Sequence, residues 1–228
     1  MYMFFERRDM PGQVSVLHVD DEPDVLDLST QLFERADSRF STVTANSGAA
    51  GMEVLADHDV DCIVSDSVRM PDGEAFIETA SRETDAPIVL FTAKEWNDVA
   101  DEAIAADVAE YVRKADASDY QTVISHVRQL SDEGDVDGDD RRLIGQHDFS
   151  SRVELGVSIV HAVENAVGGD ATEFDPLYDS VDADALERLF APAAEGPNPG
   201  NVEVHFAYEG LDLAVAADGR ITASSVPN

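Results

Sequence analysis

The sequence predicts an α/β fold, a doubly wound parallel sheet of five strands, followed by a second, smaller α+β domain. Three observations support this prediction. Between residues 14 and 130, short β-branched runs alternate with helical patterns, an order typical of parallel sheets. Residues 131–147 then hold six acids and three glycines and predict a linker. After them, helical patterns precede a series of strands. The expected domains are therefore 12–130 and 148–228.

The strands and helices of the first domain follow from apolar runs and from apolar stripes. The strand candidates are Val14–Val19, Phe40–Ala45, Val60–Ser65, Pro87–Phe91 and Ala109–Arg113. The first helix is indicated by a stripe of Val25, Leu28, Leu32, Phe33 and Ala36, and the last by Tyr120, Val123, Ile124, Val127 and Leu130. Helices are also expected over 48–57, 73–82 and 96–106. These elements make five βα units.

The second domain is predicted from similar signals. A helix is expected along Val153, Val157, Val160, Val163 and Val167, ending at Gly168-Gly169, and a short helix over 184–190. Residues 202–208, 211–215 and 221–223, separated by Glu209-Gly210 and Asp218-Gly219 turns, predict a three-stranded antiparallel meander.

Composition narrows the class of protein. The chain has 228 residues, 43% of them hydrophobic, which is enough for packed cores, and a net charge of −33. Only two lysines accompany 48 acids, a balance that suggests a salt-rich, halophilic cell in which such charge is screened. We find no basic patch for nucleic acid, so direct DNA binding is not expected.

Cysteine content and hydropathy exclude further classes. The single cysteine, Cys62, excludes an internal disulfide and a multi-cysteine zinc site. The sequence has no apolar run long enough for a membrane span and no secretory signal, so we expect a cytoplasmic protein without membrane contact.

Polar residues follow four of the predicted strands. Asp20 and Asp21 follow the first strand, Asp66 the third, Thr92 the fourth and Lys114 the fifth. The carboxyl ends of parallel strands share one edge of the sheet, so these side chains should meet. Three carboxylates together favour a Mg²⁺ ion. A hydroxyl and an ammonium beside them suit phosphoryl transfer.

The strand-end motifs resemble the receiver domain of two-component response regulators. They are Val16–Pro23, Asp61–Asp66, Leu90–Ala93 and Glu110–Lys114. The resemblance implies a flavodoxin-like sheet of order 2-1-3-4-5. It also implies that Asp66 accepts a phosphoryl group from a sensor histidine kinase, as one step of a phosphorelay. Beyond this transfer and the later loss of the phosphoryl group, no enzymatic activity is expected.

The same resemblance assigns roles to the other site residues. Asp21 and Asp66 would ligate Mg²⁺ directly, and Asp20 would hold the ion through water. Thr92 and Lys114 would contact phosphoryl oxygens. Tyr111, three residues before Lys114, matches the aromatic residue that moves inward when Thr92 is drawn to the phosphate.

The loop after Asp66 departs from the receiver pattern. Met70-Pro71 begins four positions after Asp66, and Asp72-Gly73 follows directly, so one residue is gained before Met-Pro and two are lost after it. The backbone carbonyl expected to complete the Mg²⁺ shell would be that of Val68. An alternative register makes Ser67 the acceptor, but serine cannot chelate the ion together with Asp21.

The C-terminal segment resembles the halobacterial output domain. Residues 148–228 carry a net charge of −12 and no lysine, which favours signalling through protein contacts. The face of the fourth helix, fifth strand and fifth helix is the expected surface for a homodimer or another regulator.

Two other functions stay open: a receiver-like interaction module that works without phosphorylation, and an aspartyl-phosphate phosphohydrolase. The second needs an Asp two residues after Asp20, where Glu22 stands.

Overall fold

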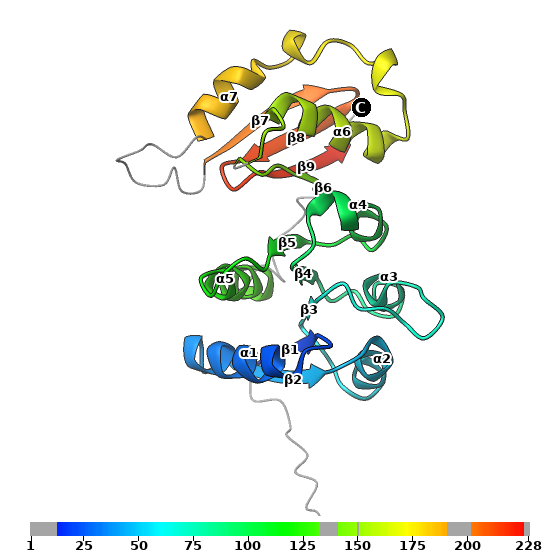
Figure 1. The fold of residues 1–228 in the computed structure, drawn as a ribbon, viewed down its shortest axis with the longest axis vertical. Helices are drawn as coiled ribbons and strands as arrows, with labels where there is room; N and C mark the ends of the chain where they lie inside the picture. Colours follow the sequence, from blue (N-terminus) through cyan, green and yellow to red (C-terminus); the bar gives the residue numbers. More distant parts are fainter. Residues whose placement is uncertain (1–12, 133–140, 150, 191–201, 226–228) are drawn as a thin grey trace, which may run out of the picture. The chain divides into compact units, whose positions relative to one another are not determined.

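A computed structural model describes residues 13–132, 141–149, 151–190 and 202–225. They form two compact units, one with a five-stranded parallel sheet and one with a four-stranded antiparallel sheet (Figure 1). By the proximity of Cα atoms, residues 96–109 group with the second unit. No helix of the described ranges has the length and apolar character needed to cross a membrane.

The parallel sheet confirms the predicted fold class. Its strands are β1 (Val14–Val19), β2 (Phe40–Ala45), β3 (Cys62–Ser65), β4 (Ile88–Thr92) and β5 (Glu110–Arg113). They lie in the order β2-β1-β3-β4-β5, and every neighbouring pair is parallel. The strand order reverses beside β1, and ligands of open α/β sheets bind at such a reversal, beyond the carboxyl ends of the strands.

Helices cover both faces of this sheet. The helices α1 (Pro23–Ala36) and α5 (Asp119–Asp132) lie on one face, and α2 (Gly48–Asp57) and α3 (Phe76–Ala80) lie on the other (Figure 1). Along the chain, α4 (Trp96–Ala105) connects β4 to β5. Local sequence explains two of the helix starts. Pro23 occupies the first turn of α1, and the Ser47 side chain accepts a hydrogen bond from the Ala50 N–H at the start of α2.

Two predicted helices of this unit need correction. The buried residues of α1 are Leu26, Ser29 and Phe33, while Leu28, part of the predicted stripe, is 44% exposed. The predicted helix over 73–82 is reduced to Phe76–Ala80. Gly73 has a φ of +94°, which is incompatible with a helix, and its N–H donates to the Met70 carbonyl in a tight turn.

Besides α4, the second unit combines an antiparallel sheet with two further helices. Its sheet has the order β6-β9-β8-β7, with β6 (Arg142–Gln146), β7 (Glu203–Tyr208), β8 (Leu211–Ala216) and β9 (Arg220–Ser225). The helices are α6 (Leu155–Val167) and α7 (Ala183–Phe190), and two short 3₁₀ turns, η1 (Ala171–Glu173) and η2 (Leu177–Asp179), lie between them. The predicted meander of three strands is present as β7, β8 and β9.

The linker prediction is wrong at its C-terminal end. Residues 142–146 form β6, which pairs antiparallel with β9 and buries Leu143 and Ile144. An apolar run of two residues within an acidic segment is too short to predict a strand, and only the partner strand makes it one. Residue 12, the predicted start of the first domain, and residues 133–140 of the predicted linker lie outside the described residues. Residues 131 and 132 of the predicted linker belong to α5.

The inward face of α6 also differs from the prediction. Val153, Val157 and Val167 of the predicted stripe are 48%, 43% and 45% exposed. The residues that pack into the core are Leu155, Ile159, Ala162 and Val163. The sequence offers two apolar stripes along α6, and the sheet packs against the stripe with the bulkier Leu and Ile.

Candidate functional site

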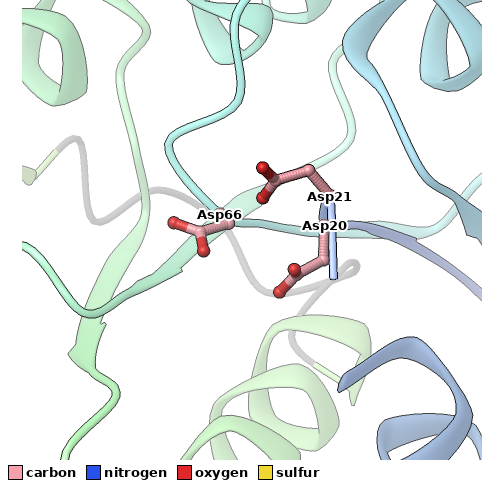
Figure 2. Close-up of side chains that lie close together, drawn as sticks. All are labelled: Asp20, Asp21 and Asp66. Atoms are coloured by element: carbon pink, nitrogen blue, oxygen red, sulfur yellow. The ribbon is translucent and has the colours of Figure 1, made fainter. Parts of the chain in front are cut away.

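Three aspartates meet at the carboxyl edge of the parallel sheet. Asp20 and Asp21 directly follow β1, and Asp66 directly follows the neighbouring strand β3. One carboxylate oxygen of each lies within 4.8 Å of one from each of the others. Figure 2 shows the three side chains close together at these strand ends. Carboxylate oxygens at this spacing suit a hard divalent cation such as Mg²⁺.

The three carboxylates differ in exposure. Asp20 is fully buried, Asp21 is exposed, and the Asp66 side chain is 17% exposed. One oxygen of Asp20 accepts a hydrogen bond from the Glu22 N–H at 2.9 Å, and the other is bound by Lys114. Both oxygens of Asp20 are therefore hydrogen-bonded inside the protein, whereas solvent reaches the carboxylates of Asp21 and Asp66.

Lys114, at the end of β5, supplies the positive charge of the site. Its Nζ donates to Oδ2 of Asp66 at 2.8 Å and to Oδ2 of Asp20. It also lies 5.1 Å from the centroid of the Phe91 ring. Burial lowers the pKa of Lys114, but the hydrogen bonds and charges of Asp20 and Asp66 outweigh it and raise the pKa above its ordinary value. The ammonium therefore stays protonated.

Asp66 is held in its ionised form. Burial alone would raise the pKa of Asp66, but hydrogen bonds from Lys114 and Thr92, the Lys114 charge and the Ser67 N–H together lower it below its ordinary value. The carboxylate is thus an ionised nucleophile that still has access to solvent.

Thr92 and Tyr111 lie on neighbouring strands near Asp66. Thr92, the last residue of β4, is 1% exposed, and its hydroxyl accepts a hydrogen bond from the Lys94 N–H at 3.3 Å. The Tyr111 hydroxyl, on β5, donates to the Lys94 carbonyl at 2.7 Å. Lys94 therefore makes hydrogen bonds with both residues of the proposed switch, Thr92 and Tyr111.

The altered loop folds back onto the start of α3. The Val68 carbonyl accepts a hydrogen bond from the Phe76 N–H at 3.0 Å. A carbonyl oxygen has a second lone pair, so the role of Val68 as a metal ligand stays a prediction. The Met70 N–H donates to the Glu74 carbonyl, and Arg69 forms a β-bridge with Ala75, so the loop is a small hairpin.

A pocket of about 590 Å³ opens beside the aspartates. It is lined by Asp21, Asn46, Ser47, Asp66, Ser67, Val68, Arg69, Thr92, Ala93 and Lys94. Two of the 15 cationic residues, Arg69 and Lys94, are among these, in a chain with 48 acids. The lining thus combines two cations with two carboxylates, Asp21 and Asp66, so the cations offset part of the negative charge at this edge of the sheet.

His18 is a buried titratable residue of the parallel sheet. It lies within β1, and its Nδ1 is 2.5 Å from the Ser29 hydroxyl. Burial, reinforced by the Lys114 charge and opposed by Asp66, lowers the pKa of His18 to about 3. His18 is therefore neutral at physiological pH. The sequence places this histidine in an apolar strand but does not indicate how far burial shifts its pKa.

Comparison with known families bears on both units. Residues 16–125 match the response regulator receiver domain, and residues 151–225 match halobacterial output domain 1. The chain joins a receiver domain to a halobacterial output domain. The receiver match begins within β1 and includes the other four parallel strands and the residues of the aspartate cluster. The output match includes α6, α7 and the strands β7, β8 and β9.

Individual relatives resemble the receiver part. The regulatory protein AtoC of Escherichia coli K12 is 34% identical over 119 residues, which are 50% of this chain and 25% of that protein. A receiver domain protein of Clostridium thermocellum is 21% identical, with a TM-score of 0.46 over 53% of this chain and 95% of that one. Response regulator TrrA of Thermotoga maritima, solved with Mg²⁺ and BeF, is 24% identical with a TM-score of 0.43, over 52% and 99%.

Proposed function

We propose that the protein is a two-component response regulator whose Asp66 accepts a phosphoryl group from a sensor histidine kinase, with Mg²⁺ as cofactor. The arrangement around Asp66 carries the proposal. Its carboxylate is ionised, lines the pocket and accepts a hydrogen bond from Lys114. Carboxylate oxygens of Asp20 and Asp21 lie within 4.8 Å of one of its own. Oxygen of Asp66 would attack phosphorus, and the bond from phosphorus to the kinase histidine would break. Lys114 and Thr92 would stabilise the charge on the phosphoryl oxygens.

Mg²⁺ would fit the same cluster. Asp21 and Asp66 are open to solvent and would hold the ion directly, while Asp20, fully buried and bonded to Lys114, would act through water. The ion would neutralise part of the charge on the transferring group. The Val68 carbonyl is the backbone ligand we propose.

Phosphotransfer to Asp66 tests the proposed function. A small phosphoramidate donor with Mg²⁺ in high salt should label the wild-type protein, and the label should be lost in acid as well as in base, as expected of the acyl phosphate of an aspartate. Asp66→Asn should remove the label because an amide cannot accept the group. Asp21→Asn should raise the Mg²⁺ concentration needed for labelling, because one direct ligand loses its charge.

The outcomes separate the competing functions. No label on the wild-type protein would favour the interaction module. Label that is acid-stable, or that survives Asp66→Asn, would contradict the acceptor. The phosphohydrolase reading is disfavoured because Asp20, the residue it needs as nucleophile, is fully buried and bonded to Lys114.

We propose that the output acts through protein contacts. Phosphate on Asp66 would draw the Thr92 hydroxyl inward and release the Tyr111 hydroxyl from the Lys94 carbonyl, changing the face of α4, β5 and α5. That face would then pair with a second receiver, in a homodimer or with another regulator. The acidic output domain makes direct DNA binding unfavourable.

Hydrogen exchange with and without beryllofluoride tests this switch. Protection should change at residues 92–96, at Tyr111 and along α5, because the hydrogen bond between Tyr111 and Lys94 is lost. The Asp66→Asn protein serves as the control and should show no change. A response confined to residues 67–75 would mean that the acyl-phosphate site is uncoupled from this face.

A further inference from the structure

Ser67 places a second hydroxyl beside the carboxylate of Asp66. Its Oγ lies 3.3 Å from Oδ1 of Asp66 and 3.4 Å from the Thr92 hydroxyl, and its N–H donates to the same Oδ1 at 2.5 Å. Ser67 is half-buried and lines the pocket. Two hydroxyls, one from the loop after β3 and one from the end of β4, therefore flank one side of the acceptor.

The two carboxylate oxygens of Asp66 face different groups. Oδ2 is bound by the Lys114 ammonium, which also holds Asp20. Oδ1 faces Ser67, whose hydroxyl in turn contacts Thr92. A phosphoryl group on Oδ1 would place its oxygens among the hydroxyls of Ser67 and Thr92.

The same geometry argues against transfer of the phosphoryl group from Asp66 to Ser67. Phosphoryl transfer places the attacking and leaving oxygens roughly in line on opposite sides of phosphorus. A hydroxyl 3.3 Å from Oδ1 lies on the side of the leaving oxygen, so it cannot attack in line once Oδ1 carries the phosphoryl group. It is instead placed beside the three equatorial oxygens, where transition-state charge accumulates.

We infer that the Ser67 hydroxyl is a catalytic group that donates a hydrogen bond to an equatorial phosphoryl oxygen, together with Thr92. The inference rests on the proposed function of Asp66. In transfer, the phosphorus–nitrogen bond of the donor breaks and the bond to Oδ1 forms. In hydrolysis, water attacks phosphorus, the bond to Oδ1 breaks, and phosphate and the free carboxylate result. Ser67 keeps its proton in both steps and accelerates both.

Matched serine variants test this role in the full-length protein. Labelled phosphoramidate with Mg²⁺ in high salt gives the rate of labelling, and removal of the donor gives the rate of loss. Ser67→Ala should slow both rates about tenfold, the effect of losing one hydrogen bond to a charged group while the other donors remain. Ser67→Thr keeps a hydroxyl and should recover most of each rate.

Ser65→Ala is the matched control. The Ser65 hydroxyl donates to the Asp66 backbone carbonyl at 2.6 Å, so this variant removes a hydroxyl on the other side of Asp66 in the sequence without removing a contact to its carboxylate. It should change both rates less than twofold. Its behaviour also reports on general disturbance of the strand end.

Several results would overturn the inference. If Ser67→Ala left both rates unchanged, or lowered only one of them, the Ser67 hydroxyl would not stabilise the transition states of both transfer and hydrolysis. Acid-stable label that disappears in Ser67→Ala would make Ser67 an acceptor instead. Equal slowing by Ser65→Ala would make the effect structural. Absence of any label on the wild-type protein would overturn the proposed function, and this inference with it.

Discussion

At the scale of single residues, Lys114 holds the acidic site together. Its ammonium bridges the buried Asp20 and the more open Asp66. A buried carboxylate without a charged partner is strongly unfavourable, so the lysine serves the fold as well as the proposed chemistry. The chain has only one other lysine, Lys94, and it lines the pocket beside Asp66. Both lysines of this acidic protein thus stand at the proposed phosphorylation site.

His147 makes the stability of the second unit depend on pH. It is 2% exposed, and its Nδ1 is 2.8 Å from the Ser158 hydroxyl. Burial lowers the pKa of His147 below its ordinary value of 6.5, although the charges of Glu187 and Asp148 oppose the shift. Below pH 6.5 the unfolded chain therefore binds a proton that the folded protein resists, and the free energy of unfolding falls.

A neutral substitution should reduce this pH dependence. We expect His147→Gln to lose less stability than the wild-type protein between pH 7.5 and 5.5, since glutamine does not titrate. One proton contributes at most about 1.4 kcal/mol per pH unit. Urea denaturation at constant high salt measures it. The many carboxylates titrate equally in both proteins, so an identical decline in the two would contradict the assignment.

At the scale of elements, α6 shows which of two apolar stripes the sheet selects. Ile159 is fully buried, whereas Val157, two positions earlier, is 43% exposed. Ile159→Ala should lower the free energy of unfolding by about 3 kcal/mol, because it removes buried methyl groups and leaves a cavity. Val157→Ala should change it by less than about 0.5 kcal/mol.

Denaturant titration of the two variants decides the orientation of α6. If Val157→Ala were the more destabilising variant, the valine stripe would face the core as the sequence alone suggested. The pair is well matched because both changes replace a β-branched residue by alanine within one helix, so differences in helix propensity are small.

At the scale of the whole molecule, the net charge of −33 should make stability depend on salt. Charges repel over a Debye length of about 30 Å at 10 mM salt and about 3 Å at 1 M. We expect the Tm to rise by several degrees as KCl is raised over this range. Scanning calorimetry measures the shift. A Tm that is unchanged, or higher at low salt, would contradict the halophilic reading of the composition.

A second salt separates screening from general salt effects. Sulfate stabilises folded proteins by exclusion from their surface, in addition to screening. At equal ionic strength below about 0.2 M, KCl and potassium sulfate should therefore give nearly the same Tm if screening dominates. A much larger effect of sulfate would point to exclusion instead.

The sequence by itself determined the parallel sheet and the meeting of its polar strand ends. Alternating apolar runs and helical patterns are local signals, and in a parallel sheet a residue that ends a strand must lie at the carboxyl edge. Asp20, Asp21, Asp66, Thr92 and Lys114 could therefore be placed together without coordinates. The strand β6, by contrast, has only Leu143 and Ile144 as apolar signal within an acidic segment.

Only the tertiary structure decided what depends on partners distant in the sequence. β6 exists because β9 pairs with it. In α6, Leu155 and Ile159 are buried and Val157 and Val167 are exposed, because of the side on which the sheet packs. The different environments of the site residues also depend on contacts between segments that are distant in the sequence. Asp20 is buried, Asp66 stays open, and Ser67 lies 3.3 Å from the Asp66 carboxylate. Burial and hydrogen bonding depend on how the folded chain packs, so the spacing of residues in the sequence does not predict them.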